Sequence, residues 1–244
     1  MWRLICNRSG DVVSDMDMVA FDIRGSIAHF RRPDTTATHL TYPFITPTAA
    51  KGIVGAILGI EDFVTSDKVG IRLLKPVRTV AQQMSMLGKE SGPSFNRPTT
   101  IELLVEPSYR IYYAGTEYTS RLIERLQQDQ SVYPTFLGVA YALTKPELYK
   151  VYEDVEWLET ETSEPLTSRS IVPVASIREL VMDPDRRFGR AGGFLHEYKG
   201  NRTFERSIDF IYETACRPIR FYPALDSEGR IRIALVEGEA VCLF

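Results

Sequence analysis

Alternating apolar and polar side chains predict a first strand at residues 19–24. Val19, Phe21 and Ile23 alternate with Ala20, Asp22 and Arg24. Because successive side chains of a strand point to opposite faces, this order predicts one apolar face, with Arg24 on the other. Gly25 follows and indicates a bulge or a close backbone approach at the end of the strand.

A helical pattern of apolar residues begins after residue 46. Thr46 is a hydroxyl N-cap, and Pro47 stands at the first helical position, where its missing N–H costs nothing. Two neighbouring apolar stripes follow, made of Ala49, Ile53 and Ile57 and of Ala50, Val54 and Leu58. The helix is therefore expected to bury a broad face, and Gly52, Gly55 and Gly59, which follow its period, are expected to allow close packing.

The loop between this strand and this helix carries most of the candidate chemistry. Its candidates are His29, Arg31, Arg32, His39 and Tyr42. The free N-terminal amides and the dipole of the helix are expected to point back toward the loop. Basic side chains beside a helix N-terminus are typical of a phosphate-binding site.

The order of the elements predicts the fold class. Further strands are expected over residues 69–80, 101–113 and 139–143, with a break at Pro107, and a second helix over 117–130. The polar segment 81–98 is expected to project from the sheet as a long hairpin or loop. Strand, helix, strand, strand, helix, strand is the order of ferredoxin-like and RNA-recognition folds, so we expect an α+β protein with a βαββαβ core.

The C-terminal part of the chain follows a less regular pattern. Strands are predicted over residues 150–158 and 230–235, whereas the basic, glycine-rich segment 186–201 shows no clear periodicity and is expected to be a loop. We therefore expect two domains, a ferredoxin-like domain at 18–145 and an irregular, mainly β extension at 146–244.

Composition narrows the class of protein. With 244 residues, 44% of them hydrophobic, the chain is long enough to bury a sizeable core. No apolar run approaches the ~20 residues of a membrane span, and the first residues lack the apolar core of a secretion signal, so a cytoplasmic protein without a membrane partner is expected. The three cysteines are far apart and only three histidines accompany them, which predicts neither a disulfide framework nor a metal site. No cofactor is expected.

Charge is distributed unevenly along the chain. The formal net charge of −3 argues against indiscriminate binding to nucleic acid. Basic segments nevertheless occur at residues 24–51, 72–97 and 186–206, with net charges of +3, +4 and +4, whereas residues 147–164 carry −6. Each segment alone is consistent with a solvated face, but basic segments that also hold aromatics and glycine or proline favour a nucleic-acid interface. The acidic segment leaves a protein–protein scaffold as another possibility.

Metal-independent RNA cleavage is the catalytic chemistry that the loop supports. In this reaction one side chain takes the 2′-hydroxyl proton and a second protonates the leaving oxygen. His29, His39, Tyr42 and Lys51 stand in the right segment for it. The alternative is that the histidines contact RNA or fill the loop while Tyr42 packs beneath it, and the residues alone leave both open. No G-x-S-x-G elbow or glycine-rich phosphate motif offers another mechanism.

Several motifs of the first half resemble a known family. They are Gly25-x-x-Ala28-x-Phe30-Arg31-Arg32, Tyr42-Pro43, Thr46-Pro-Thr-Ala-Ala-Lys-Gly52 with Gly55-Ala-Ile-Leu-Gly59, Glu106-Pro-Ser-Tyr109, and Tyr133-Pro-Thr-Phe-Leu-Gly138. Over residues 18–143 the chain resembles the CRISPR-associated fifth-family subunit of type I Cascade complexes, a member of the RAMP superfamily. Residues 1–16 fall outside the pattern, as an alternative start would.

The resemblance implies a partner and a site. Such subunits cap the 5′ handle of crRNA beside the backbone and large subunits, and serve recognition of target DNA through the complex. The resemblance also implies a thumb at residues 77–100, in which Met84, Met86 and Leu87 wedge between nucleotides. The residues expected to contact RNA are Arg24, His29, Arg31, Arg32, His39, Tyr42, Lys51, Arg187 and Arg190. A hooked single strand would be recognised by stacking on tyrosine or arginine planes and by phosphate contacts.

One branch of this family, in type I-C systems, is itself the nuclease that processes pre-crRNA. In that branch a tyrosine at the position of Tyr42 acts with a Lys-His pair on a later strand. Residues 98–113 of this chain contain no such pair, and Arg110 is the only base in the second half of that segment. The resemblance thus favours a non-catalytic, handle-binding subunit closest to type I-B members, with a metal-independent endoribonuclease as the alternative.

Overall fold

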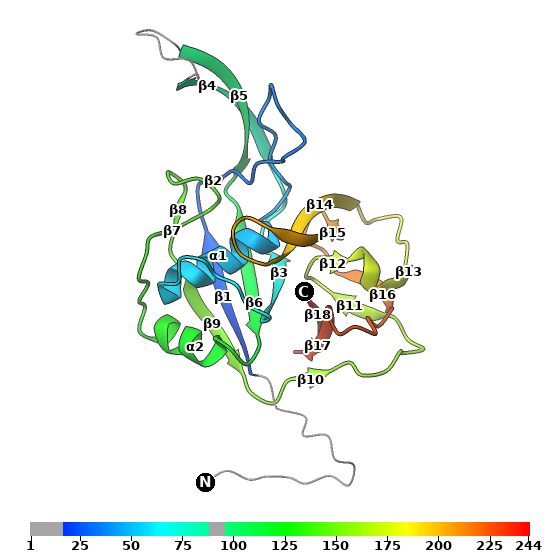
Figure 1. Ribbon diagram of the computed structural model, residues 1–244. Coiled ribbons are helices and arrows are strands. Elements are labelled where there is room, and N and C mark those ends of the chain that lie inside the picture. The colour runs from blue at the N-terminus through cyan, green and yellow to red at the C-terminus, as the bar shows by residue number, and fades with distance from the viewer. Residues whose placement is uncertain (1–16, 88–95) are drawn as a thin grey trace.

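The computed structural model describes residues 17–87 and 96–244, and its N-terminal part is built on a four-stranded antiparallel sheet (Figure 1). The sheet has the order β3-β6-β1-β9 and consists of β1 (Met18–Arg24), β3 (Lys68–Leu73), β6 (Ser108–Ala114) and β9 (Glu147–Tyr152). Helix α1 (Pro47–Leu58) lies between β1 and β3 in the chain, and α2 (Thr119–Gln127) lies between β6 and β9. The α+β class predicted from the sequence is confirmed.

Strand β1 is buried on both faces. Val19, Phe21 and Ile23 pack into the main apolar cluster, which also contains the buried face of α1. Met18 and Ala20 point the other way, into a second cluster with residues of the C-terminal strands. Only Arg24, at the end of the strand, is exposed, so the position predicted for its side chain is confirmed.

Helix α1 begins at the predicted residues. The Ala49 N–H donates to Thr46 Oγ1 at 3.1 Å, and Gly59 ends the helix in the left-handed region with φ 76°. Gly55 lies against Phe63, where an added Cβ would approach the Phe63 side chain to 2.9 Å, so its predicted packing role is confirmed. For Gly52 the prediction is wrong, because a Cβ there would meet no atom within 4 Å.

Two predicted strands differ from the structure. The segment predicted as a strand at 139–143 is instead a turn closed by a 2.9 Å hydrogen bond from Ala142 N–H to Val139 O, with Gly138 at φ 83°. This turn joins β7 (Thr135–Phe136) to β8 (Leu143–Thr144), and the sheet's fourth strand is β9, which lies beyond the domain boundary expected at residue 145. The strand predicted over 69–80 stops at Leu73, and Pro76 separates it from the next one.

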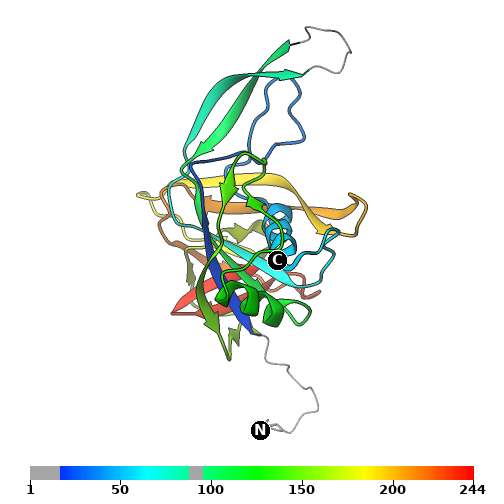
Figure 2. The same ribbon diagram turned by 90° about the vertical axis from the view of Figure 1, so that its left-hand side faces the viewer.

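A long hairpin projects from the body of the protein in both views (Figures 1 and 2). It consists of β4 (Thr79–Leu87) and β5 (Asn96–Val105), and the short β2 (Ile27–Ala28) pairs with the base of β5. The hairpin predicted from the polar segment is therefore present, and the break predicted at Pro107 separates β5 from β6. Residues 88–95, within the predicted thumb, and residues 1–16, the proposed alternative start, lie outside the described residues.

Three small sheets form the C-terminal part. They are β10 (Glu156–Trp157), β17 (Arg232–Val236) and β18 (Glu239–Leu243); β11 (Leu166–Ser168), β16 (Ile219–Pro223) and β13 (Ile177–Leu180); and β12 (Val172–Pro173), β15 (Phe204–Glu213) and β14 (Phe188–Tyr198), with a 3₁₀ turn at Val174–Ser176. The prediction of a basic loop at residues 186–201 is wrong, because most of this segment forms the strand β14. A register shift between Ala191 and Phe194 breaks the alternation of side chains that would have indicated a strand.

The two parts of the chain share one core. The main apolar cluster joins residues of α1 and β1 to Phe194, Phe210 and Phe244 of the C-terminal part. Strands β17 and β18 cover the sheet face opposite the helices, where Val236 and Val241 meet Met18. Among the described residues, no helix is long and apolar enough to cross a membrane.

Candidate nucleic-acid interface

The loop of residues 29–42 lies beside the base of the projecting hairpin, as both ribbon views show (Figures 1 and 2). The His39 N–H donates to Thr100 O at 2.9 Å, and the Glu102 N–H donates to His39 O at 2.9 Å. The loop also pairs with itself, since the Tyr42 N–H donates to Phe30 O at 2.8 Å. These backbone hydrogen bonds fix the loop along the edge of β5.

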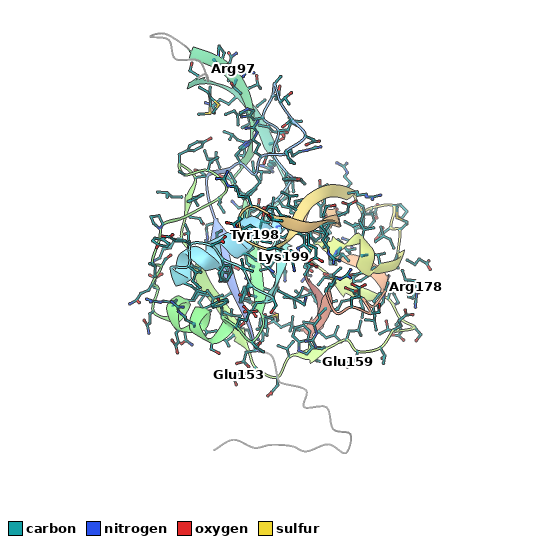
Figure 3. The ribbon with its side chains drawn as sticks, in the orientation of Figure 1. Arg97, Glu153, Glu159, Arg178, Tyr198 and Lys199 are labelled. Atoms are coloured by element: carbon teal, nitrogen blue, oxygen red, sulfur yellow. The ribbon has the colours of Figure 1, made fainter. Side chains whose placement is uncertain are left out.

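Two arginines concentrate positive charge on this surface. Arg31 is exposed and reaches only Thr35 O, at 3.5 Å, while Arg97 on β5 lies near the far end of the hairpin (Figure 3). Neither belongs to the ion pairs found among residues 17–87 and 96–244. Partial burial lowers the pKa of His39, and the charges of Arg31, His29 and Arg97 lower it further. Both arginine charges therefore act at His39.

Other predicted cations are neutralised by carboxylates. Arg24 pairs with Glu147 of β9, and Arg32 pairs with Asp34 at 2.6 Å. The hydrogen bond to Asp34 raises the pKa of Arg32. An anionic strand would have to compete with these carboxylates, whereas Arg31 and Arg97 face no such competition among the described side chains.

His29 is a buried part of the loop. Its Nδ1 donates to Glu102 O at 2.8 Å, and its backbone N–H donates to Leu137 O at 3.2 Å. Gly138 approaches so closely that an added Cβ would lie 2.1 Å from His29 O. The glycine of the Tyr133–Gly138 motif thus allows the β7–β8 turn to pack against the loop.

Tyr42 is a buried link to the C-terminal part. Its hydroxyl donates to Gly193 O at 2.7 Å, and its ring stacks on Phe194 with 4.2 Å between the ring centroids. Burial raises the pKa of Tyr42. A hydroxyl that has a raised pKa and already donates its proton to a carbonyl is poorly suited to act as a base at neutral pH.

A cavity of about 250 Å³ opens between the loop and the first turn of α1. Its lining includes Arg31, His29, Thr48 and Leu195, so the helix N-terminus does face the basic loop as predicted. Leu195 is 45% exposed and gives the cavity an apolar wall on β14. Leu195 was not predicted as a site residue, because a single leucine in a segment without periodicity carries no local signal.

Two of the thumb residues, Met84 and Met86, lie on one hairpin face with a cation. Met84 and Met86 are two residues apart on β4, so they share one face, and Met86 is 39% exposed. Met86 is the register partner of Arg97, and Met84 that of Thr99, so Met86 and Arg97 are neighbours across the hairpin. Leu87 is the last residue of β4, and its side chain lies outside the described ones.

Three other predicted contacts are not among the residues that line the cavity beside Arg31. Lys51 lines a separate cavity on the other side of Thr48. Arg190 on β14 pairs with Asp209 at 2.9 Å, and Arg187 lies just before the beginning of the same strand. Arg110, the base noted on β6, is held by Asp22 at 2.8 Å.

Comparison with known proteins relates the N-terminal part of the chain to a protein family. Residues 18–110 match the family model described as CRISPR-associated protein (Cas_Cas5). This segment is similar to the Cas5 family of CRISPR-associated proteins, and we call it the Cas5 segment. The Cas5 segment contains the loop 29–42, α1 and the whole β4–β5 hairpin, and therefore includes Arg31, Met86 and Arg97.

One solved structure shows a similar fold. A chain of a structure titled "CRISPR RNA-guided surveillance complex" is 12% identical, with a TM-score of 0.50, over 85% of this chain and 91% of that chain. A CRISPR protein from Archaeoglobus fulgidus is 11% identical, with a TM-score of 0.48, over 93% of this chain and 98% of its own. A further structure, titled "Crystal structure of Cas protein", is 15% identical with a TM-score of 0.47, over 82% and 94%. No curated protein matches the chain by sequence.

Proposed function

We propose that the chain is a non-catalytic subunit of a type I CRISPR surveillance complex, nearest to type I-B members, and that it binds the 5′ handle of crRNA. The observation that carries this proposal is the surface formed by Arg31, Arg97 and Met86, which all lie within the Cas5 segment. We call it the handle surface. The similarity in fold to a chain of an RNA-guided surveillance complex supports a role in such an assembly.

The chemistry of the handle surface suits a single strand. Guanidinium groups without carboxylate partners bind phosphates, and exposed apolar side chains such as Met86 and Leu195 pack against unstacked bases. Contacts of this kind recognise an RNA strand by its folded shape. In the complex, the backbone and large subunits would extend the RNA site, and target DNA would be contacted through the assembly.

The proposal is tested by the affinity of the purified protein for a repeat-derived 5′ handle RNA, with a scrambled RNA of equal length as the control. Fluorescence anisotropy should show at least about tenfold tighter binding of the handle. Equal affinity for the two RNAs would remove handle recognition and leave only a general electrostatic attraction.

Tyr42→Phe separates binding from the endoribonuclease alternative. Handle affinity should stay within about twofold, because the Tyr42 hydroxyl donates to Gly193 O and is buried, whereas the free energy of unfolding should fall by about 1–2 kcal/mol when that carbonyl loses its partner. Denaturant unfolding and RNA binding measure the two effects. Tyr133→Phe, an exposed tyrosine, is the matched control.

The endoribonuclease alternative predicts that the protein cleaves repeat RNA. The Tyr42 hydroxyl donates to Gly193 O, and Lys51 lies in another cavity, so neither group is free beside His29 to complete an acid–base pair. Incubation of repeat RNA with the wild type in EDTA should therefore yield no product. A product that Tyr42→Phe abolishes would establish the nuclease and overturn the non-catalytic role.

A further inference from the structure

A second cavity, of about 280 Å³, lies between α1 and the β14–β15 hairpin. Pro47, Thr48 and Lys51 line one side, and His196 and Tyr198 line the other. Figure 3 shows Tyr198 and Lys199 where the hairpin passes in front of α1. Thr48 also lines the cavity beside Arg31, so the two cavities adjoin at the first turn of α1.

Two nitrogen groups line this cavity without partners. His196 is 4% exposed, and neither its side chain nor that of Lys51 has a hydrogen-bond or ion-pair partner among the described residues. Burial lowers the pKa of Lys51 to about 8, with the charge of Lys68 adding to the effect. Burial, together with the charges of Lys51, Lys68 and Arg206, lowers the pKa of His196 to about 4. At neutral pH the cavity thus holds one ammonium group and one neutral imidazole.

Carboxylates line the same cavity. Glu61 is exposed and has no ion-pair partner among the described side chains. Asp62 accepts a 2.5 Å hydrogen bond from the Tyr198 hydroxyl, and Glu197 pairs with Arg206 at 3.0 Å. Apolar walls complete the lining, with Phe63 buried and Phe204 half-buried.

This lining selects against simple ions. The carboxylates of Glu61 and Asp62 repel a phosphate, and the ammonium group of Lys51 repels a lysine or arginine side chain from a partner protein. A neutral, flat ligand with acceptors on one edge and donors on the other satisfies both sets of groups. Guanine has these properties, since O6 and N7 accept from lysine and N1–H and the 2-amino group donate to carboxylates.

We propose that this cavity binds a guanine base of the RNA strand, with Lys51 and His196 facing its O6 and N7 edge, Glu61 facing its N1 and amino edge, and Phe63 and Phe204 against its ring. The inference rests on the proposed RNA-binding function, because the strand would reach the cavity from Arg31 past Thr48. The volume of about 280 Å³ leaves room for a purine base.

Nuclear magnetic resonance of the full chain tests the proposal with mononucleotides. The imidazole Hε1 signal of His196, assigned through His196→Gln, is followed during titration with the 5′-monophosphates of guanosine, adenosine, cytidine and uridine. We expect a saturable shift with the guanosine nucleotide alone. Glu61→Gln should weaken this binding by about tenfold, because a charged acceptor is lost, and Glu153→Gln, an exposed glutamate elsewhere (Figure 3), should leave it unchanged.

Each other result overturns the guanine site. No shift with any nucleotide means that the cavity takes no base, and equal shifts with all four mean that it does not distinguish guanine. Unchanged affinity in Glu61→Gln means that the guanosine nucleotide binds elsewhere. Handle RNA binding is measured on the same preparation, so loss of the guanosine response with retained handle binding rejects the guanine site alone. The converse result rejects the handle proposal alone.

Discussion

Reversal of two charges, Arg31→Glu together with Arg97→Glu, is expected to weaken binding of handle RNA by about 100-fold at about 0.1 M salt. Neither arginine has a carboxylate partner among the described residues, so both charges are free to attract phosphates and the reversal turns attraction into repulsion. Each phosphate of a single strand that the protein neutralises steepens the fall of log affinity with log salt by about 0.7. Anisotropy titrations over a salt series should therefore show a slope that is shallower by about 1.4 in the double variant.

A matched double reversal separates position from net charge. Arg178 on β13 and Arg220 on β16 are exposed on the C-terminal part, and Figure 3 shows Arg178 far from Arg97. Arg178→Glu with Arg220→Glu changes the net charge equally and should leave handle affinity within about threefold. An equal weakening of RNA binding in the two double variants would mean that RNA responds to overall charge, and the handle surface would lose its support.

Phe194→Ala is expected to cause the largest loss of stability, about 4 kcal/mol in the free energy of unfolding. Phe194 is fully buried and stacks on Tyr42 at 4.2 Å and on Phe44 at 5.1 Å between ring centroids. It also meets Phe210 edge to face at 5.2 Å. Removal of the ring leaves a cavity where β14 joins the N-terminal part, and denaturant unfolding followed by circular dichroism measures the cost.

Phe136→Ala is the control for this prediction. Phe136 is a phenylalanine of β7 that is 43% exposed, so its truncation should cost less than about 1 kcal/mol. If both variants lost the same free energy, the shared aromatic core would not connect the two parts of the chain, and the position assigned to Tyr42 would be in error.

Elements with local signals were predicted correctly. The N-cap Thr46 and Pro47 define the beginning of α1, and each acts through its own backbone geometry. The polar segment after residue 80 and Pro107 likewise predicted the hairpin and its end. Such signals need no knowledge of what packs against the element.

Elements that depend on distant partners were not predictable. Strand β9 was predicted only from residue 150 onward, because it lies at the sheet edge and its first residues are identified by their pairing with β1. In β14, the register shift at the two glycines after Ala191 removes the strand pattern. A strand that lies at the edge of a sheet or contains a bulge lacks the alternation on which sequence analysis depends.

The candidate site also has a part that local signals predict and a part that depends on distant residues. The basic loop and its position beside the helix N-terminus followed from adjacent residues. The ion pair between Arg24 and Glu147 and the hydrogen bond from Tyr42 to Gly193 join residues 123 and 151 positions apart. Interactions over such distances decide which cations remain free of carboxylate partners, so the free cations could not be chosen from the sequence alone.

Photo-cross-linking of handle RNA substituted with 4-thiouridine, followed by mass spectrometry of the adducts, tests the central claim most directly. We expect adducts in residues 29–42, in the β4–β5 hairpin and around Leu195, which together border the handle surface. Adducts confined to the C-terminal strands β10, β13 and β16, with none in the loop or the hairpin, would contradict the handle surface as the RNA site.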